Sequence, residues 1–428
     1  MELKEYKLGD IAEIITGVSY TPNDITTSGI RILRGGNIQA ETVLLKSDDV
    51  FLPMSYANNN QLKKYDTIIV SSTGSVDALA KGATIFEDLP NTQIGAFLRI
   101  IRPKEEKYAM IISMWCTSPF FRQYMIKKAK GTSINNIRTD FLTDFPILIP
   151  KDNNLEHTSK LYLNLESKLL LNRQINQNLE ALARQLYDYW FVQFDFPNEE
   201  GKPYKSSGGK MVYNPILKRE IPEGWEVKTL SSFISKNNTG DWGKDEDFEK
   251  SIQIGCVRGA DIVTLCNLPT RYIKNNPSKL LQPFDIVIEI SGGSPTQATG
   301  RSAFITEGVI SRNGGAISCS NFCHAFTMKN VKKAPYFFYL WQTFYDNDIM
   351  FNYEGKTSGL KNFMTDTFLA NTWFDAPDIL TNLFYEKVMG IFSEIDNNIA
   401  EILSLTKQRD ELLPLLMNGQ VNFDLSDD

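Results

Sequence analysis

The chain has 428 residues, with 45 Lys and Arg against 51 Asp and Glu, which gives a formal net charge of -6. This acidic balance argues against a protein that coats nucleic acid regardless of sequence, because such proteins carry a basic excess. With 42% hydrophobic and 11% aromatic residues, the composition is that of a globular protein rather than a disordered one.

Two blocks of the chain, residues 1–150 and 223–376, share one character. In each, short β-type runs alternate with helical runs, and turns rich in Gly, Ser, Asn and Pro separate them. The clearest predicted strands and helices are, in chain order, Thr67–Val70, Tyr108–Lys128, Ile147–Ile149, Ile286–Ile290 and Pro335–Phe351. We therefore expect two α+β domains.

A long helical segment follows each block, with apolar residues at alternating spacings of four and three. This spacing is typical of a coiled coil. The predicted seam residues are Leu165, Asn172, Ile175, Leu179, Leu182 and Leu186 in the first segment, and Val388, Ile391, Ile395, Asn398, Ile402 and Leu405 in the second. A helix of about 40 residues spans about 60 Å. We expect the two helices to pair antiparallel and hold the blocks apart. The alternative is that each helix packs on its own block.

The second half of the chain repeats the first in a constant order. Lys63-Lys64-Tyr65-Asp66 returns as Gln282-Pro283-Phe284-Asp285, and Arg34-Gly35-Gly36-Asn37 returns as Arg258-Gly259-Ala260-Asp261. Such an ordered repeat of half the chain predicts a duplicated unit, each copy made of one domain and one helix. The expected division is 1–150 for domain 1, 151–195 for helix 1, 196–222 for an exposed linker, 223–376 for domain 2, 377–417 for helix 2 and 418–428 for an acidic tail.

The acidic excess belongs to one segment. Residues 377–428 hold 10 acidic and 3 basic side chains, whereas both domain blocks are nearly neutral. Within those blocks, residues 107–139 and 308–345 include basic side chains and no acidic one. Such stretches can supply contacts to phosphates, although a solvated helix face has the same composition.

The sequence offers no assembled catalytic site. It has neither a complete phosphate-binding loop nor a Gly-rich dinucleotide fingerprint. Cys319, Cys323 and His324 are the one arrangement suggestive of a metal, but their spacing is not that of a zinc knuckle, so we expect packing residues and no metal. Five cysteines without a disulfide framework and the lack of a signal or membrane span predict a soluble, cytoplasmic protein.

The end of the first long helix carries a distinctive motif. It reads Asn178-Leu-Glu-Ala-Leu-Ala-Arg-Gln-Leu-Tyr-Asp-Tyr-Trp-Phe191 and is followed by Phe194-Asp-Phe-Pro197 and Ile221-Pro-Glu-Gly-Trp225. The second helix ends similarly, at Lys407–Gly419, and Gly131–Ile137 matches an end-of-domain pattern. Through these stretches, nearly the whole chain resembles the specificity (S) subunit of type I restriction-modification systems.

The resemblance implies a non-catalytic subunit without a cofactor of its own. Two target-recognition domains would each read one half of a bipartite, asymmetric site in double-stranded DNA. The helices would space the halves and dock two DNA adenine methyltransferase (modification) subunits, which use S-adenosylmethionine and flip the adenine out of the duplex. Cleavage and translocation, which need ATP and Mg, would come from restriction subunits.

The residues expected to touch DNA are basic or polar and lie in or near Gly- and Ser-rich loops. In the first domain they are Arg34, Ser72, Ser75, Lys128, Lys130, Thr132, Ser133, Asn135, Asn136 and Arg138. In the second domain they are Arg258, Ser294, Gln297, Arg301, Arg312, Asn313, Lys356, Ser358 and Lys361. For each of them the alternative is a turn or capping residue.

Two other functions remain open from the sequence. Dispersed carboxylates could form a metal-dependent nuclease, and the heptads could serve a coiled-coil scaffold that ignores DNA.

Overall fold

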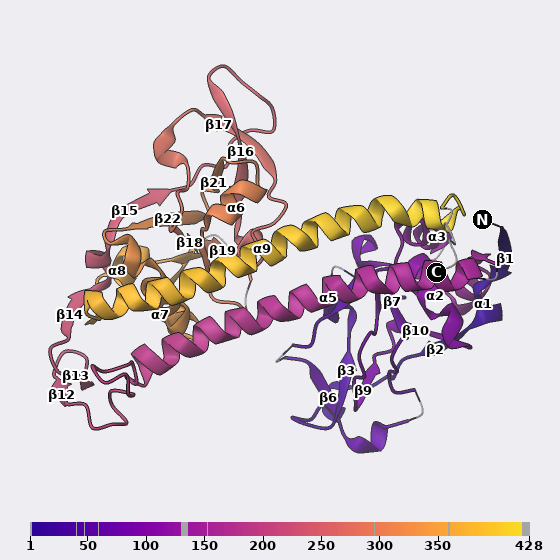
Figure 1. Ribbon diagram of the computed structural model, residues 1–428, viewed down its shortest axis with the longest axis horizontal. Helices are drawn as coiled ribbons and strands as arrows, with labels where there is room; N and C mark the ends of the chain where they lie inside the picture. The colour runs from indigo at the N-terminus through magenta and orange to yellow at the C-terminus, as the bar shows by residue number, and fades with distance from the viewer. Residues whose placement is uncertain are drawn as a thin grey trace. The chain divides into compact units, whose positions relative to one another are not determined.

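The computed structural model describes residues 2–39, 41–46, 48–58, 60–129, 136–151, 153–294, 296–357 and 360–421. The chain forms two compact units, which we treat separately. Unit 1 consists of Met1–Leu171 with Leu403–Asp428, and unit 2 consists of Asn172–Ile402. The long helices α5 (Asn153–Tyr187) and α9 (Asp378–Met417) each contribute residues to both units (Figure 1).

Unit 1 contains an antiparallel four-stranded sheet of order β2-β10-β7-β8 and a three-stranded sheet of order β6-β3-β9. Two strand pairs, β1-β11 and β4-β5, complete its sheets. The strands are β1 (Leu3–Lys7), β2 (Ala12–Thr16), β3 (Ile30–Leu33), β4 (Ile38–Gln39), β5 (Thr42–Val43), β6 (Val50–Leu52), β7 (Thr67–Val70), β8 (Gly82–Thr84), β9 (Thr92–Ile94), β10 (Leu98–Pro103) and β11 (Pro146–Pro150). The short helices are α1 (Leu8–Ile11), α2 (Ala109–Cys116), α3 (Pro119–Ala129) and α4 (Thr139–Thr143).

The helix predicted over Tyr108–Lys128 is broken into α2 and α3. Pro119 begins α3, where a residue without an N–H fits the first turn and cannot continue the preceding helix. The Ser118 hydroxyl accepts a hydrogen bond from the Phe121 N–H at 3.1 Å and so satisfies one donor of that turn. All eight residues of α2 are buried, whereas α3 buries one side only and leaves Lys127 and Lys128 exposed.

Unit 2 contains an antiparallel four-stranded sheet of order β15-β22-β18-β20 and three-stranded sheets of orders β17-β16-β21 and β19-β24-β23. Two further strand pairs are β12-β13 and β14-β25. The strands are β12 (Met211–Asn214), β13 (Arg219–Pro222), β14 (Glu226–Thr229), β15 (Ile234–Thr239), β16 (Ser251–Val257), β17 (Thr270–Lys274), β18 (Ile286–Glu289), β19 (Ser291–Gly292), β20 (Ser302–Phe304), β21 (Ile317–Cys319), β22 (Cys323–Met328), β23 (Glu354–Thr357), β24 (Leu360–Phe363) and β25 (Thr372–Asp375). The short helices are α6 (Glu307–Arg312), α7 (Ala334–Asp346) and α8 (Thr365–Leu369).

The predicted duplication is confirmed by the topology. The sheet β2-β10-β7-β8 has its counterpart in β15-β22-β18-β20, and the parallel pair β3-β9 has its counterpart in β16-β21. The turns before β7 and β18 also match. The Lys63 N–H donates to Asp66 Oδ2 at 2.8 Å, and the Gln282 N–H donates to Asp285 Oδ2 at 2.8 Å. The repeated sequence therefore encodes a repeated local geometry.

Two glycines hold equivalent places in the copies. Gly17 follows β2 and Gly240 follows β15. A Cβ at Gly17 would lie 2.2 Å from the Gly95 carbonyl oxygen, and one at Gly240 would lie 2.0 Å from the Ser320 carbonyl oxygen. Only a residue without a side chain permits this close approach of two backbone segments.

We expect Gly17→Ala and Gly240→Ala each to lower the free energy of unfolding by about 1–3 kcal/mol, the usual cost of overpacking. Urea denaturation of the full chain measures this. Gly74→Ala is the matched control, since a Cβ at that position would meet no heavy atom within 4 Å, and its effect should stay within about 0.5 kcal/mol. Equal effects of all three substitutions would contradict the close-approach argument.

Helix α9 buries the stripe that its heptads predict, including Val388, Ile395, Asn398 and Leu405, with Ile391 and Ile402 half-buried. Of the seam residues predicted in α5, Asn172 is buried, whereas Leu165, Ile175, Leu182 and Leu186 each lie one residue before a buried position. The buried positions of α5 are Tyr162, Glu166, Leu169, Asn172, Asn176, Ala183 and Tyr187, whereas Leu182 is 51% exposed and Leu165, Ile175, Leu179 and Leu186 are half-buried. The seam of α5 contains polar and aromatic residues, so following its Leu and Ile residues alone gives the wrong register.

The two long helices contact each other in antiparallel order within unit 2. Asn172 Nδ2 donates to Glu401 Oε2 at 2.7 Å, and Asn398 Nδ2 donates to Asn176 Oδ1 at 2.9 Å. Residue numbers rise along α5 where they fall along α9, so the two helices run antiparallel. These amide pairs satisfy polar groups in the seam and specify its register.

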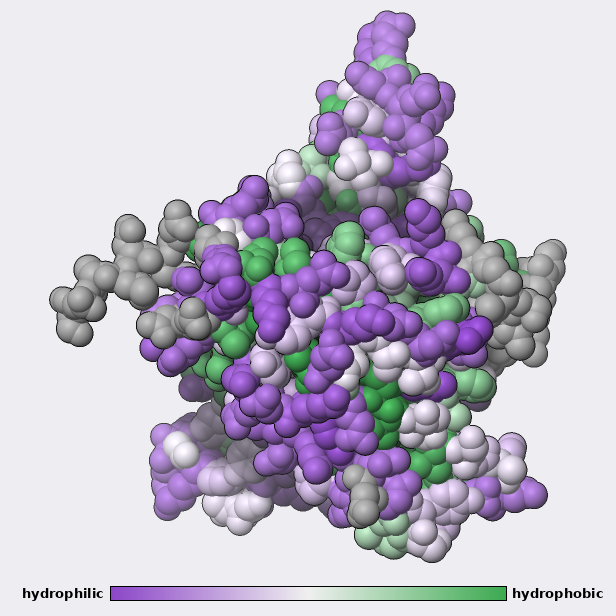
Figure 2. Space-filling view, turned by 90° about the vertical axis from the view of Figure 1, so that its right-hand side faces the viewer, coloured by the Kyte–Doolittle hydropathy of each residue, from purple (hydrophilic) through white to green (hydrophobic). Residues whose placement is uncertain are grey.

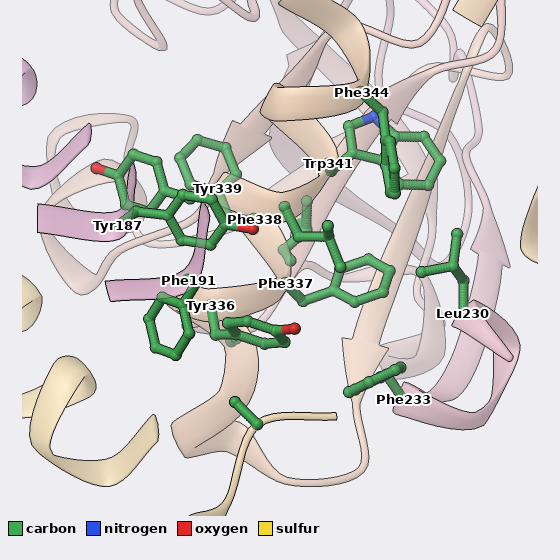
Figure 3. Close-up of a cluster of buried hydrophobic side chains, with 14 of the residues drawn as sticks. Tyr187, Phe191, Leu230, Phe233, Tyr336, Phe337, Phe338, Tyr339, Trp341 and Phe344 are labelled. Carbon is green, nitrogen blue, oxygen red and sulfur yellow. The ribbon is translucent and has the colours of Figure 1, made fainter. Parts of the chain in front are cut away.

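An aromatic cluster joins the end of α5 to unit 2 (Figure 3). Tyr187 and Phe191 pack beside Tyr336 of α7, with ring centroids 6.1 and 4.8 Å from it. The same cluster includes Phe384 and Val388 of α9. The helices thus pack on each other and also on the blocks that precede them, α9 through Phe384 and α5 through Tyr162.

The segment 196–222, predicted as an exposed linker, is largely exposed but has a defined fold. Phe196 stacks between Tyr204 and Trp225 with ring centroids 4.7 and 5.4 Å away, and it joins the aromatic cluster of unit 2 with Ile221. The hairpin β12-β13 closes the segment. Its Gly, Ser and Pro content serves tight turns here rather than a flexible connection.

In the part of the chain that the structure describes, no helix is long and apolar enough to cross a membrane. The face shown in Figure 2 is mostly hydrophilic, and hydrophobic residues reach it in separate patches.

Candidate nucleic-acid interface

A Ser- and Gly-rich loop follows the central strand β7 of unit 1. The N–H groups of Ser71 and Ser72 donate to the Phe97 carbonyl oxygen at 2.9 and 3.1 Å, which anchors the start of the loop. Ser75 caps the following 3-10 turn, Val76–Ala78, because its hydroxyl accepts from the Asp77 N–H at 3.3 Å. Asn136 pairs with Ser72 in an isolated β-bridge. The loop thus presents hydroxyls and amides on a fixed backbone.

The turn that begins with Arg34 lies across from this loop. Arg34 precedes the 3-10 turn Gly35–Asn37, and its N–H donates to Asn37 Oδ1 at 2.8 Å. Between the turn and the loop is a cavity of about 1020 Å³ lined by Gly35, Gly36, Ile38, Gln39, Val70, Ser72, Thr73, Gly74, Ala78, Lys81 and Phe97. Small residues and backbone groups line much of it, which allows close approach of a ligand backbone.

Three predicted cations of unit 1 are exposed. The Arg34 guanidinium donates to the Asp48 carbonyl oxygen at 3.5 Å. The Lys128 ammonium lies 5.6 Å from the Tyr124 ring centroid. Arg138 pairs with Asp140 at 2.9 Å, but both side chains are at least half exposed, so water weakens that pair. All three remain accessible to an anionic partner.

Unit 2 repeats the framework with different side chains. Arg258 precedes the 3-10 turn Gly259–Asp261, and its guanidinium donates to both oxygens of Asp261 at 2.7 and 2.9 Å. The Ser294 hydroxyl accepts from the Gln297 N–H at 3.2 Å in the loop after β19, and Gln297 is exposed. The two copies therefore share the backbone geometry of this turn and differ in the side chains that they expose.

Four residues predicted at the second interface are engaged inside unit 2. Arg301 forms two hydrogen bonds with Glu289, at 2.8 and 2.7 Å, and Arg312 pairs with Asp396 of α9 at 2.6 Å. Lys361 pairs with Glu354 at 3.0 Å, and the Asn313 side chain bonds the backbone of residues 265, 268 and 309. The partner of Arg312 lies 84 residues further along the chain, whereas Glu289 and Glu354 lie within 12 residues of the cations that they pair with. We leave these four out of the proposed interface.

Lys130, Thr132, Ser133, Asn135 and Ser358 lie outside the described residues, as does the side chain of Lys356.

Three residues at this site were not predicted from the sequence. Lys81 is exposed and lines the cavity of unit 1. Phe97 lines the same cavity, and Phe322 holds the equivalent place in unit 2, where its carbonyl oxygen accepts from the Ile290 and Ser291 N–H groups. Comparing the two copies position by position could have found the phenylalanines, since both stand one residue before a strand of the four-stranded sheet.

The cysteines near His324 behave as packing residues. Cys319 and Cys323 are buried, and burial raises the pKa of the Cys323 thiol to about 12. A thiol held protonated is a poor metal ligand. Over the described ranges, no group of three or more His, Cys, Asp or Glu side chains could hold a metal ion.

The chain is similar in sequence to curated specificity subunits of type I restriction enzymes. It is 25% identical to the type I restriction enzyme MjaIX specificity subunit of Methanocaldococcus jannaschii, over 98% of this chain and 89% of that protein. It is 22% identical to the type I restriction enzyme HindI specificity subunit of Haemophilus influenzae, over 98% of this chain and 99% of that protein. No protein-family model matches the chain.

The fold agrees with these relatives. The crystal structure of a type I restriction-modification system S subunit from M. genitalium superposes with a TM-score of 0.56 at 14% identity, covering 97% of this chain and 96% of that chain. At that identity the match establishes the fold alone. The chain is thus similar, along almost its whole length, to type I restriction enzyme specificity subunits in sequence and to an S subunit in fold.

Proposed function

We propose that the chain is the DNA-reading subunit of a type I restriction-modification complex. Each unit reads one half of a bipartite site, and the helices α5 and α9 space the halves. They also dock DNA adenine methyltransferase subunits and, through them, restriction subunits. The chain itself carries out no chemistry, and S-adenosylmethionine, ATP and Mg are bound by its partners.

The observation that carries this proposal is the duplicated loop framework with unlike side chains. In unit 1 the loop after β7, the Arg34 turn and the exposed cation Lys81 form a polar site with amides and hydroxyls. Such groups bind phosphates and read base edges. Because the equivalent turn of unit 2 has Arg258 paired with Asp261, the two halves of the site should differ in sequence.

A reconstitution experiment tests the division of labour. The purified full chain is incubated with DNA and radiolabelled S-adenosylmethionine, alone and with its methyltransferase subunits. The proposal predicts methyl transfer only in the combined reaction, at defined adenines. Methylation or Mg-dependent cleavage by the chain alone would instead identify an enzyme. Site-specific methylation by the methyltransferase subunits without the chain would instead indicate that the chain is a scaffold that does not read DNA.

A further inference from the structure

Two exposed phenylalanines stand at equivalent turns of the two copies. Phe97 joins β9 to β10 in unit 1 and is 69% exposed, and Phe322 joins β21 to β22 in unit 2 and is 41% exposed. Single exposed apolar residues are ordinary on protein surfaces. A large apolar side chain left in water at the same place of both copies, in units whose other side chains differ, requires an explanation.

The backbone of both residues is fixed in the same way. Each is the third residue of a four-residue turn, closed by Leu98 N–H to Gly95 O in one copy and by Cys323 N–H to Ser320 O in the other, both at 2.9 Å. Each carbonyl oxygen also accepts two successive N–H groups from the segment after the central strand. The distances are 2.9 and 3.1 Å for Phe97, and 2.9 and 3.3 Å for Phe322.

The glycines described above hold these turns from the other side. Gly17 passes against Gly95, and Gly240 passes against Ser320, at the first residue of each turn. The main chain around each phenylalanine is therefore held on two sides while its side chain stays exposed. A rigid apolar group loses little conformational entropy on binding, which suits a contact residue.

The surroundings of Phe97 point to the kind of partner. It lines the same cavity as Lys81, Ser72, Thr73 and Gly74, so a cation, hydroxyls and backbone amides adjoin an apolar ring. A protein or lipid surface would call for a wider apolar area. DNA combines an anionic backbone with apolar base faces, thymine methyls and sugars, and phenylalanine is among the side chains that contact them.

We infer that Phe97 and Phe322 are a matched pair of DNA-contact residues, each making an apolar contact with bases of the half-site read by its own unit. This inference rests on the proposed function and adds to it the residues that contribute the apolar part of recognition. The polar loop beside each ring would supply the hydrogen bonds and phosphate contacts.

The test uses the full chain in complex with its methyltransferase subunits and DNA duplexes carrying the mapped bipartite site. Equilibrium affinity is measured for wild type, Phe97→Ala and Phe322→Ala on the intact site and on duplexes with either half scrambled. Each substitution should weaken binding to the intact site about tenfold, the discrimination typical of one base contact. Phe97→Leu, which keeps an apolar side chain, should recover part of the loss.

Coupling to one half of the site distinguishes contact from a general effect. The loss caused by Phe97→Ala should nearly vanish when one particular half is scrambled, and the loss caused by Phe322→Ala should vanish with the other half. Tyr213→Ala, at a 65% exposed aromatic residue of β12, is the control and should bind like wild type. Melting temperatures close to that of wild type would confirm that the variants fold.

Unchanged affinity of both alanine variants would overturn the inference, as would equal losses on every duplex or coupling of both residues to the same half. The proposed function fails in a different way, since the wild-type complex itself would then show no preference for any bipartite site.

Discussion

Replacing Arg409 by alanine is expected to lower the free energy of unfolding by about 3–5 kcal/mol, because it leaves the buried carboxylate of Glu166 and the partly buried one of Glu41 without their cation. Arg409 of α9 is 7% exposed and pairs with Glu41, with Glu166 of α5 at 3.2 Å and with Asp410 at 2.7 Å. It therefore fastens α9 both to α5 and to the turn that contains Glu41, within unit 1. Urea denaturation followed by circular dichroism measures the loss.

Two further variants separate the ion pair from helix propensity. Lys407→Ala removes a cation from the same helix at an exposed position, 3.9 Å from Glu411, and should change stability by less than about 0.5 kcal/mol. Arg409→Met combined with Glu166→Met removes both charges and should recover much of the loss. If Arg409→Ala were no worse than Lys407→Ala, the network would have no structural role.

The loss of stability caused by Arg409→Ala should also depend on pH. Burial raises the pKa of Glu41 even beside Arg409, so the fold opposes its ionisation relative to the unfolded chain. An acid whose pKa is higher in the folded than in the unfolded chain lowers the free energy of unfolding. The loss is complete above the folded pKa and absent below the unfolded pKa. Arg409→Ala raises the pKa of Glu41 further, so its destabilisation should be largest near neutral pH and shrink as the solution is acidified toward the unfolded pKa of a glutamate, about 4.3.

Removing the three exposed cations of unit 1 should weaken DNA binding about 10- to 100-fold at low salt. The variant is Arg34→Ala with Lys128→Ala and Arg138→Ala. If each side chain neutralises one phosphate, the slope of log affinity against log salt should become shallower by about 3. Because these are phosphate contacts, binding to unrelated duplexes should weaken similarly. Fluorescence anisotropy of the complex on labelled DNA at several salt concentrations gives both quantities.

A matched triple variant removes the same charge elsewhere. Lys202, Lys205 and Lys210 belong to the folded segment 196–222, and their combined replacement by alanine should leave the salt slope of DNA binding unchanged. Equal slopes for both triple variants and wild type would remove the cations of unit 1 from the interface.

The duplication was predictable because the repeated sequence motifs form turns of the same geometry in both copies. Short motifs such as Lys63–Asp66 and Gln282–Asp285 encode one capping geometry each, and their constant order identified two copies with the same strand order. Helix α9 (Asp378–Met417) agrees with the predicted range 377–417, whereas α5 ends at Tyr187 and a π-helical turn, Asp188–Val192, follows it. Apolar spacing also gave the buried stripe of α9, whose seam is rich in Val, Ile and Leu.

The register of α5 and half of the second interface required the structure. In α5 the seam includes Glu166, Asn176 and Tyr187, and a polar residue becomes a seam residue only when its partner across the interface is known. The pairing of Arg312 with Asp396 is likewise set by a tertiary contact, and that of Lys361 with Glu354 by the register of the hairpin β23-β24. The net charge of -6 is a poor guide to DNA binding, because the acidic surplus lies in residues 377–428.

The central claim is that this chain decides where its partners methylate DNA. Mapping methylated adenines genome-wide, in cells that express the methyltransferase with and without this chain, tests it most directly. We predict a bipartite motif of two unlike halves separated by an unspecified gap, present only when both proteins are expressed. The same methylation pattern without this chain, or no methylation with both proteins expressed, would contradict the account.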